Sequence, residues 1–527
     1  MIKMPFQYTL IVLTLVFLLC ACNTGDETGQ EVSRYSEQHR PRFHFSPDSM
    51  WTNDPNGMVF YDGEYHLFYQ HNPFENVWGP MHWGHAVSSD LVHWNHLPIA
   101  LYPDSLGTIF SGSAVIDWEN SSGLGRADTP PMIAIFTHHN QKMADAGSLS
   151  FQYQSIAYSL DKGRSWTKYP GNPVLENPGI PDFRDPKVIW HKQSGRWIMV
   201  FAARDKVLFY SSINLIDWRI ESEFTAHRPQ GEGVWECPDF FPLQGEEGSF
   251  WVLLVSVGSG GPNGGSGTKY YIGEFDGSRF TPLDEQAEPG WIDYGKDNYA
   301  GVTWSDIPEE DGRRLFLGWM SNWQYANKVP TEKWRNAMTV PRELSLAKEG
   351  ITYKLVSRPV EELDTLLTEL IRVDRVTFSG KKTMGLSELE PSQYDIEFTY
   401  RVARGPDCDL ISDFGIILEN HQGQEVIAGY NLKKNKVFVD RTRSGNTNFS
   451  ANFPGKHTAP YHFAENGIIK FRALIDHSSI ELFVDDGKLV MTELFFPDEP
   501  FHILSFYSKG GSIELTLGRI SSVKGSW

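Results

Sequence analysis

Five apolar segments recur along the chain at intervals of about 55 to 65 residues, and this repeat constrains the fold more than any other feature. The segments begin at Tyr65 (YHLFYQ), Pro131 (PMIAIFTH), Arg196 (RWIMVFAA), Phe250 (FWVLLVSV) and Arg314 (RLFLGWMS). Three of them are followed by similar sequences, SSDLVHW, SLDKGRSW and SSINLIDW, which are typical of a hairpin corner. Because no helical periodicity lies between the segments, we expect repeated four-stranded units and a five-bladed β-propeller over residues 41–353.

A different pattern begins after about Tyr353 and indicates a second domain. The sequence SRPVEELDTLL predicts a short helical linker within residues 354–370. Beyond it, apolar residues alternate with polar ones, as between Ile469 and Ile475, which is typical of half-buried strands. Asp486-Gly487 between two apolar runs predicts a hairpin turn. We therefore expect an all-β protein whose residues 371–527 form an antiparallel β-sandwich.

The first residues resemble an export signal. Lys3 precedes an apolar run that ends before Cys22, and the sequence Leu-Cys-Ala-Cys resembles a bacterial lipoprotein box. The resemblance implies that residues 1–22 are a lipoprotein-type signal, cleaved so that a lipidated Cys22 becomes the mature N-terminus. The lipid would anchor the protein at the periplasmic face or the cell surface of an outer membrane. An ordinary secretory peptide is the alternative. The polar residues 23–40 predict a flexible tether.

The charge of the chain excludes some classes of partner. The formal net charge of the 527 residues is -19 at pH 7, which disfavours binding to nucleic acid or to an anionic lipid surface. The membrane is therefore expected as a partner only through the N-terminal lipid. The sequence gives no indication of the oligomeric state.

One short motif, WTNDPNG at residues 51–57, combines a carboxylate with turn-forming residues. Pro55 biases Asp54 toward extended backbone, and Asn56 and Gly57 tolerate the positive φ of a tight reversal. We expect Asp54 to end a strand and to face open space. Taken alone, the motif also fits an Asx turn that closes a hairpin.

Two further carboxylates occupy equivalent places in the repeat. Asp54 and Asp185 each precede an apolar segment by eleven residues, and Glu236 precedes one by slightly more. Equivalent positions of different blades converge on the axis of a propeller, so we expect the three acids to meet at one mouth of the channel. Such a cluster costs stability unless it binds a cation or performs acid-base chemistry. The aromatic and neutral polar residues around it favour a sugar over a metal, and we expect no cofactor.

The motifs WTNDPNG, FSGSAV, FRDPK and WECPD, in this order, resemble those of glycoside hydrolase family 32, which contains levanases, inulinases and invertases. The resemblance runs from about Arg42 to the C-terminus. Tracts such as YHLFYQHNPF and LGWMSNWQYAN resemble bacterial levanases in particular. Thr52 is a small departure, since the family often has Met there.

The resemblance implies roles for the three acids. Asp54 would be the nucleophile, Glu236 the acid and base, and Asp185 the residue that stabilises the transition state. It also implies a fructose pocket lined by Asn53, Gln70, Trp78, Phe110, Ser111, Arg184 and Trp319.

The implied activity is a retaining hydrolysis that releases fructose from the ends of β-fructans, with levan preferred and inulin and sucrose as poorer substrates. An endo-levanase is one alternative. More remote alternatives are a propeller glycosidase that acts on arabinan or xylan with inversion, and a non-catalytic lipoprotein that captures sugar. The C-terminal sandwich is expected to be structural, with carbohydrate binding as its alternative role.

Overall fold

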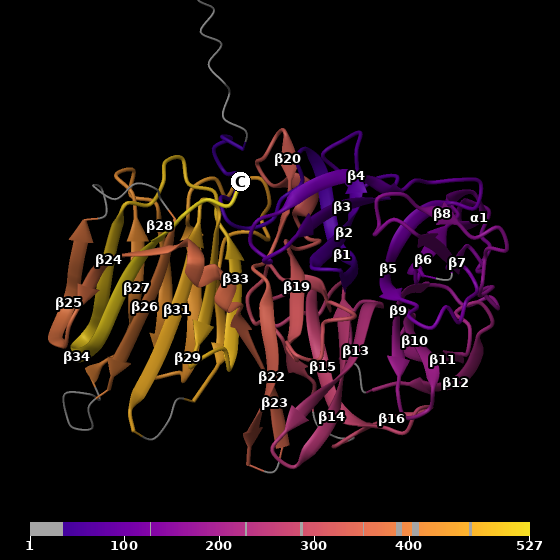
Figure 1. The fold of residues 1–527 in the computed structure, drawn as a ribbon. Coiled ribbons are helices and arrows are strands. Elements are labelled where there is room, and N and C mark those ends of the chain that lie inside the picture. The colour runs from indigo at the N-terminus through magenta and orange to yellow at the C-terminus, as the bar shows by residue number, and fades with distance from the viewer. Residues whose placement is uncertain are drawn as a thin grey trace, which may run out of the picture.

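Two all-β domains lie side by side, a propeller and a sandwich (Figure 1). The protein is described here by a computed structural model, which covers residues 35–126, 128–226, 229–284, 288–350, 352–385, 393–402, 410–462 and 466–527. The predicted signal peptide, the predicted lipid attachment site Cys22 and the predicted tether up to residue 34 lie outside these ranges. Within them, no helix has the length and apolar character needed to cross a membrane.

Each of the first five sheets is one propeller blade of four main strands. Blade 1 contains β1 (Met50–Tyr61), β2 (Glu64–Asn72), β3 (His82–Ser88), β4 (Asn95–Leu101) and the added β20 (Trp334–Arg335). Blade 2 contains β5 (Thr108–Ile116), β6 (Met132–His139), β7 (Gln152–Ser159) and β8 (Thr167–Lys168). Blade 3 contains β9 (Phe183–His191), β10 (Arg196–Ala203), β11 (Lys206–Ser212) and β12 (Arg219–Phe224).

The last two blades each carry one short additional strand. Blade 4 contains β13 (Trp235–Gly245), β14 (Gly248–Val257), β15 (Gly267–Phe275), β16 (Phe280–Pro282) and the added β17 (Gly290–Trp291). Blade 5 contains β18 (Tyr299–Thr303), β19 (Arg314–Met320), β22 (Arg342–Glu349), β23 (Thr352–Pro359) and the added β21 (Ala337–Met338). The helices are short: α1 (Gln141–Asp145), η1 (Ala326–Lys328) and η2 (Glu361–Leu366).

The predicted five-bladed propeller is confirmed, and the repeat has a simple physical origin. The five apolar segments are the second strands of their blades, and they are buried because the neighbouring blades cover both of their faces. The first strands β1, β5, β9, β13 and β18 are innermost and contact one another around the axis. Parallel pairing of β20 with the start of β1 joins blade 5 to blade 1 and closes the ring.

The motif WTNDPNG does not form the predicted tight reversal. It lies inside β1, which continues to Tyr61 before the chain turns. Gly57 does have the expected positive φ of 51°. A Cβ at this position would lie 2.7 Å from the rings of Phe68 and Trp83, so the strand passes too close to its neighbours for a larger residue.

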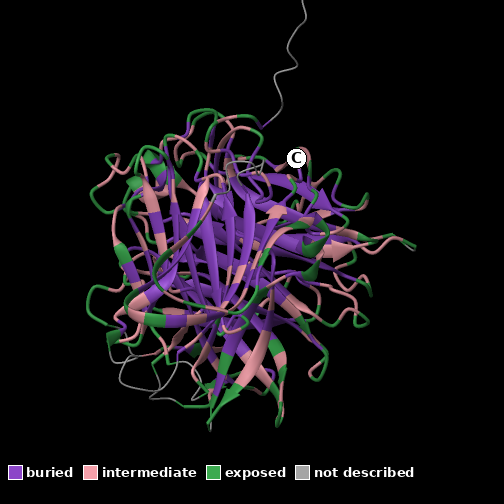
Figure 2. Cartoon of the chain, turned by 90° about the vertical axis from the view of Figure 1, so that its left-hand side faces the viewer, coloured by how far each residue is buried: buried purple, intermediate pink, exposed green. Residues whose placement is uncertain are grey.

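The predicted sandwich is also confirmed, and one long strand joins its two layers. β34 (Ile503–Val523) pairs with β25 and β27 through its first half and with β24 and β26 through its second half. The other strands are β24 (Leu367–Val373), β25 (Val376–Gly385), β26 (Tyr394–Arg401), β27 (Asp413–Glu419), β28 (Glu425–Asn431), β29 (Lys436–Arg443), β30 (Lys456–Pro460), β31 (Ile468–Asp476), β32 (Ser479–Val484) and β33 (Leu489–Leu494). Viewed from the sandwich side, buried strands fill the interior and exposed residues gather in the loops (Figure 2).

The tether before the propeller and the linker after it are both shorter than predicted. β23 extends to Pro359 and β24 begins at Leu367, so both ends of the predicted linker 354–370 lie in strands. The last residues of the predicted tether also pack on the protein. Arg40 is fully buried and donates to Ser46 and to the carbonyl oxygen of Pro47, because its guanidinium finds acceptors in the chain that follows.

The domain interface is held by charged groups in addition to apolar contacts. Arg342 of β22 donates to Glu481 of β32 and to Asp293, and all three side chains are buried. His44 contacts Glu481 and Asp476 at 2.8 Å each. Burial alone would lower the pKa of His44, but these two carboxylates raise it to about 9. Since removing one partner of such a buried pair costs about 3 to 5 kcal/mol, the network fixes how the domains pack.

Candidate active site

The five innermost strands share one irregularity at the same level of the channel. In each, two residues face a single residue of the second strand, which is a β-bulge. The bulged pairs are Asn53–Asp54, Phe110–Ser111, Asp185–Pro186, Cys237–Pro238 and Ala300–Gly301. Because a bulge re-aims side chains, this ring of five bulges directs residues from all blades toward the axis.

The structure brings the three predicted carboxylates together at this level. The backbone N–H of Cys237 donates to Asp185 at 3.0 Å, and its thiol lies 3.3 Å from Asp54 Oδ2. Arg184 Nη2 binds Glu236 Oε1 at 3.0 Å, and Arg184 Nε lies 3.8 Å from Asp185 Oδ2. Arg184 and Cys237 therefore link all three acids.

Asp54 and Asp185 both resist ionisation. Burial raises the pKa of Asp54, and the charge of Glu236 adds to the rise, while hydrogen bonds oppose it. Burial also raises the pKa of Asp185 to about 7 against the attraction of Arg184, and the charges of Glu236 and Asp54 add to the rise. Perturbation of this kind by burial and like charge is characteristic of sites that perform acid-base chemistry.

Two residues of this cluster, Asp185 and Cys237, have an unusual backbone conformation. Asp185 has φ 66° and Cys237 has φ 43°, a region that residues other than glycine rarely adopt. Both residues belong to bulges, and each is followed by a proline, which lacks the N–H that a regular ladder would use. Strain of this kind is tolerated where the surrounding structure needs a side chain in one place.

Neighbouring side chains hold the acids in fixed orientations. Ser111 Oγ donates to Asp54 Oδ2 at 2.6 Å, and Asn53 Nδ2 donates to Asp54 Oδ1 at 3.0 Å. The hydroxyl of Tyr299 donates to Glu236 Oε2. Both oxygens of Asp54 and both of Glu236 are therefore held by polar partners.

A pocket of about 400 Å³ opens above the acids. Its wall contains all three carboxylates and six of the seven residues predicted to bind sugar: Asn53, Gln70, Trp78, Phe110, Ser111 and Arg184. Trp319 is the exception, because it is fully buried beneath Trp323, whose ring lies 4.8 Å away. Trp323 lines the pocket instead.

The pocket also contains residues that the sequence did not single out. Arg184 Nη1 binds Asp182 at 2.6 Å and Gln152 at 3.3 Å, and both partners line the pocket. His139 stacks on Phe110 with ring centres 4.3 Å apart. Among the described residues, no group of three or more His, Cys, Asp or Glu side chains is placed to hold a metal ion.

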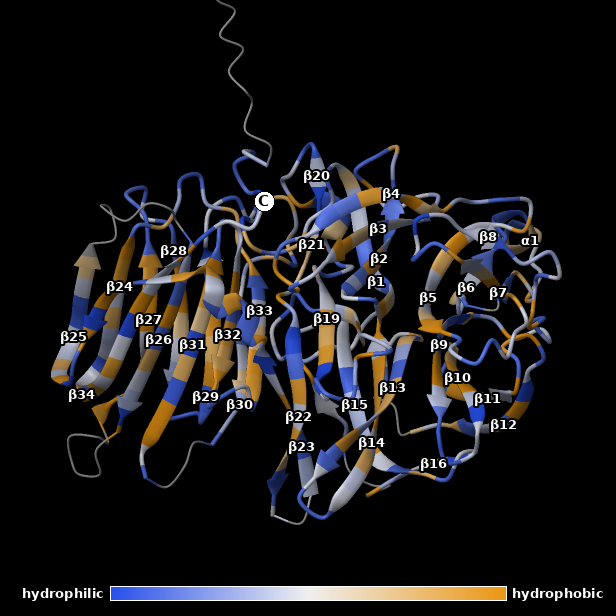
Figure 3. Cartoon of the chain, in the orientation of Figure 1, coloured by the Kyte–Doolittle hydropathy of each residue, from blue (hydrophilic) through white to orange (hydrophobic). Residues whose placement is uncertain are grey.

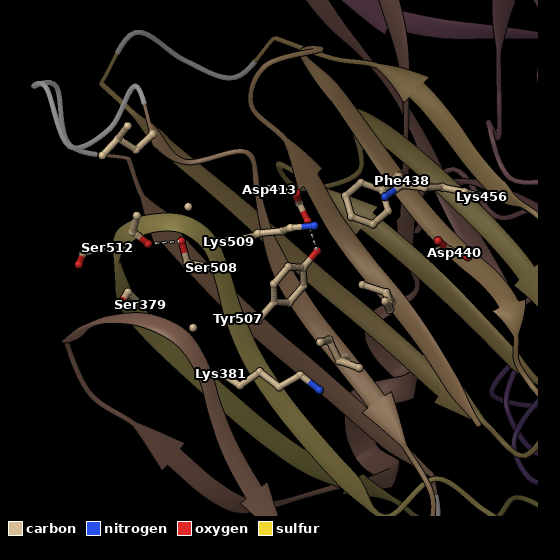
Figure 4. A pocket seen from close by; sticks show the side chains of 16 residues that line it. Ser379, Lys381, Asp413, Phe438, Asp440, Lys456, Tyr507, Ser508, Lys509 and Ser512 are labelled. Carbon is tan, nitrogen blue, oxygen red and sulfur yellow. Dashed lines mark hydrogen bonds between the residues drawn. The ribbon is translucent and has the colours of Figure 1, made fainter. Parts of the chain in front are cut away.

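The sandwich contains a second hollow that lacks the features of this pocket (Figure 4). Its aromatic residues are covered: Phe438 is 1% exposed, and Lys456 Nζ lies 3.4 Å from the centre of its ring. Tyr507 is buried and donates to Asp413. Neither ring presents a free face on which a sugar could stack.

Comparison with known proteins agrees with this geometry. Residues 44–359 match the profile described as the glycosyl hydrolases family 32 N-terminal domain, and residues 362–524 match that of the family 32 C terminal. The chain is 45% identical to a levanase of Bacillus subtilis, over 98% of this chain and 75% of that protein. It is 35% identical to the levanbiose-producing levanase of the same organism, over 91% and 90% of the two chains.

Solved structures show the same architecture. The exo-inulinase from Aspergillus awamori superimposes with a TM-score of 0.85 at 33% identity, covering 94% of this chain and all of that one. A fructofuranosidase from Schwanniomyces occidentalis, in complex with fructosylnystose, superimposes with a TM-score of 0.83 at 30% identity, covering 93% and 98%. The propeller with its three central acids, the attached sandwich and these matches together show that the chain is a glycoside hydrolase and belongs to family 32.

Proposed function

We propose that the protein releases single fructose units from the ends of β-fructans, with levan preferred over inulin and sucrose. One observation carries the proposal: the three acids lie in a pocket of about 400 Å³ that ends within the channel. Below the acids, the void between the innermost strands shrinks to about 10 Å³, which is too small for a sugar. A pocket closed in this way admits a chain end and excludes the middle of a chain.

The three acids have different roles in a two-step displacement. Asp54 attacks the anomeric carbon and forms a covalent fructosyl-enzyme, while Glu236 transfers its proton to the leaving oxygen. Glu236 then removes a proton from water, which attacks the same carbon and releases Asp54. Two displacements at one carbon retain its configuration. Asp185 contacts fructose hydroxyls and stabilises the positive charge of the transition state.

The pocket wall provides the contacts that orient the fructose. Trp78 is 42% exposed, so its ring offers apolar surface to a sugar. The amide Nε2 of Gln70 is buried and has no acceptor among the described residues, so it is free to donate to a ligand hydroxyl. Asn53 and Arg184 already bind the acids and add donors next to them.

The preference for levan rests on similarity to relatives. The Bacillus subtilis levanase is 45% identical to the chain, whereas an exo-inulinase of Aspergillus ficuum is 36% identical. The levanbiose-producing relative supports the alternative that longer products are released. The closed end of the pocket favours single units.

Chromatography of early levan digests tests the mode of attack. Free fructose alone at low conversion supports exo-action, and the Asp54→Ala variant, which lacks the nucleophile, should give no product. A ladder of oligosaccharides at low conversion would instead mean that chains lie across the site, as in an endo-levanase. Parallel rates on levan, inulin and sucrose measure the linkage preference.

The proposed location is a membrane surface, reached through a lipid on Cys22. Relatives described as extracellular agree with export, and the sequence around Cys22 supports the anchor. Labelling with a fatty-acid analogue followed by membrane fractionation tests it. Wild type should carry the label and sediment with membranes, whereas Cys22→Ala should carry none. A wild-type protein without label would reject the anchor while leaving the enzymatic proposal intact.

A further inference from the structure

The opposite mouth of the propeller channel contains a larger cavity than the active site. Its volume is about 1220 Å³, and it is lined by the distal parts of β1, β5, β9 and β13 and by the segment that follows β18. Each of these strands runs from the acids toward this mouth: β1, for example, carries Asp54 near its start and Tyr61 at its end. The cavity and the active site therefore lie at opposite ends of one axis.

A buried ion pair separates the two. Lys187 Nζ lies 3.2 Å from Asp239 Oδ1 and donates to the carbonyl oxygen of Thr303 at 2.7 Å. Lys187 also lines the small void beneath the acids, so it stands between the two spaces. Because this plug closes the channel, a chain whose end occupies the active site cannot pass through to the far mouth.

Two exposed tryptophans at the far mouth are held in fixed positions. Trp118 is 57% exposed, yet its indole N–H donates to the half-buried carboxylate of Asp306 at 2.9 Å, and its ring packs against that of Tyr61 with centres 5.7 Å apart. Trp190 is 44% exposed and packs edge-on against Trp197 at 5.1 Å. Ligand sites are commonly preformed, and here two aromatic faces are already ordered while open to solvent.

The chemistry of the lining selects a neutral, hydroxyl-rich ligand. Six acidic side chains line the cavity, so an anion is disfavoured: Asp62, Asp117, Glu119, Glu274, Asp306 and Glu309. Three basic residues of the wall already interact with other side chains and so offer little charge to an anion: Lys187 binds Asp239, Lys192 binds Glu309 and Arg314 packs over the ring of Phe241. Flat aromatic surface together with hydrogen-bond acceptors suits the C–H faces and hydroxyls of a carbohydrate.

We propose that this cavity, which we call the distal site, binds a β-fructan chain. The assignment of the ligand rests on the proposed function, because a polymer that the enzyme degrades is the carbohydrate present around it. Occupation of the distal site by one chain or branch keeps the enzyme next to other chain ends and raises their effective concentration at the pocket. The distal site takes no part in the chemical step.

Affinity electrophoresis of the full-length protein in gels that contain levan tests the distal site without relying on hydrolysis. All variants carry Glu236→Gln so that the polymer stays intact during the run. The double variant Trp118→Ala/Trp190→Ala should bind levan at least about fivefold more weakly than its parent, as expected for loss of two exposed aromatic contacts. Trp118→Phe, which keeps a ring, should retain most of the binding. Ile220 lies on β12 outside the cavity and is about as exposed as Trp118, so the Ile220→Ala variant should bind levan as the parent does.

Kinetics in the wild-type background separate this proposal from the proposed function. In the double tryptophan variant, kcat/KM for sucrose should stay unchanged while KM for levan rises, because only the polymer reaches both sites. Equal levan binding by parent and double variant would overturn the distal site even in an active fructanase. Equal retardation by dextran and by levan would overturn the assignment to a fructan. If the wild type releases no fructose while the gel effect persists, the proposed function fails and the distal site remains a carbohydrate site.

Discussion

Replacement of Asp185 by Asn should stabilise the protein while it strongly lowers hydrolysis. Burial and the neighbouring acids raise the pKa of Asp185 from 3.8 to about 7. Its ionisation in the folded protein therefore costs free energy above pH 3.8, and the cost reaches its full value above pH 7. This rise in the pKa of Asp185 corresponds to a cost of about 4 kcal/mol. Asn resembles the protonated carboxyl and can still accept from the Cys237 N–H, so the variant avoids this cost.

Thermal melting at two pH values measures the effect. The expected gain is about 4 kcal/mol at pH 8 and about 0.5 kcal/mol at pH 4. For a chain of this length, 1 kcal/mol corresponds to about 1 °C, so the variant should melt about 4 °C higher than wild type at pH 8 and nearly with it at pH 4. Asp145→Asn on the exposed helix α1 is the control and should follow wild type. A variant that melts lower than wild type at pH 8 would refute the reasoning, because it would mean that the ionised Asp185 is a net stabilising group.

Other consequences of the structure can be tested separately. Glu236→Ala should lower turnover by several orders of magnitude on fructan yet recover much of the first step with a donor whose leaving group needs no proton, whereas Asp54→Ala should not recover; equal loss with both donors contradicts the roles. The pKa of His44 is raised to about 9, so protonated His44 stabilises the fold fully below pH 6.5, and this stabilisation should disappear as the pH rises through 9. Over that pH range, the melting temperature of wild type should therefore fall more steeply than that of His44→Gln. Trp323→Ala should raise KM for fructans with little change in stability, while Trp319→Ala should cost about 3 to 5 kcal/mol of stability; a reversed pattern would place Trp319 in the pocket.

The sequence was sufficient to predict the propeller because each blade repeats one physical demand. In each blade, the second strand is covered on both faces and must therefore be apolar along its length, as β10 and β14 are. The same repeat placed Asp54, Asp185 and Glu236 at equivalent positions, which is why their meeting could be predicted before the structure. The alternation of polar and apolar residues in the sandwich strands is equally visible along the chain (Figure 3).

Features that depend on contacts between blades could not be predicted in this way. A Pro-Asn-Gly sequence after Asp54 suits both a tight turn and a bulge, since both use positive φ and a missing N–H; only the pairing of β1 with β2 distinguishes them. Trp319 and Trp323 belong to one tract, and their exposure differs because Trp319 lies in β19 and Trp323 in the loop after it. Gln152 and Asp182 reach the pocket through Arg184 and belong to no motif.

The central claim is that Asp54 becomes covalently bound to fructose during each turnover. Incubating the Glu236→Gln variant with an activated fructosyl donor should allow the first step and slow the second, because the base that activates water is missing. Mass spectrometry should then find one fructosyl residue on the protein, located on the peptide that contains Asp54. An adduct on another residue, or rapid turnover of the donor with no adduct at any time, would contradict the account.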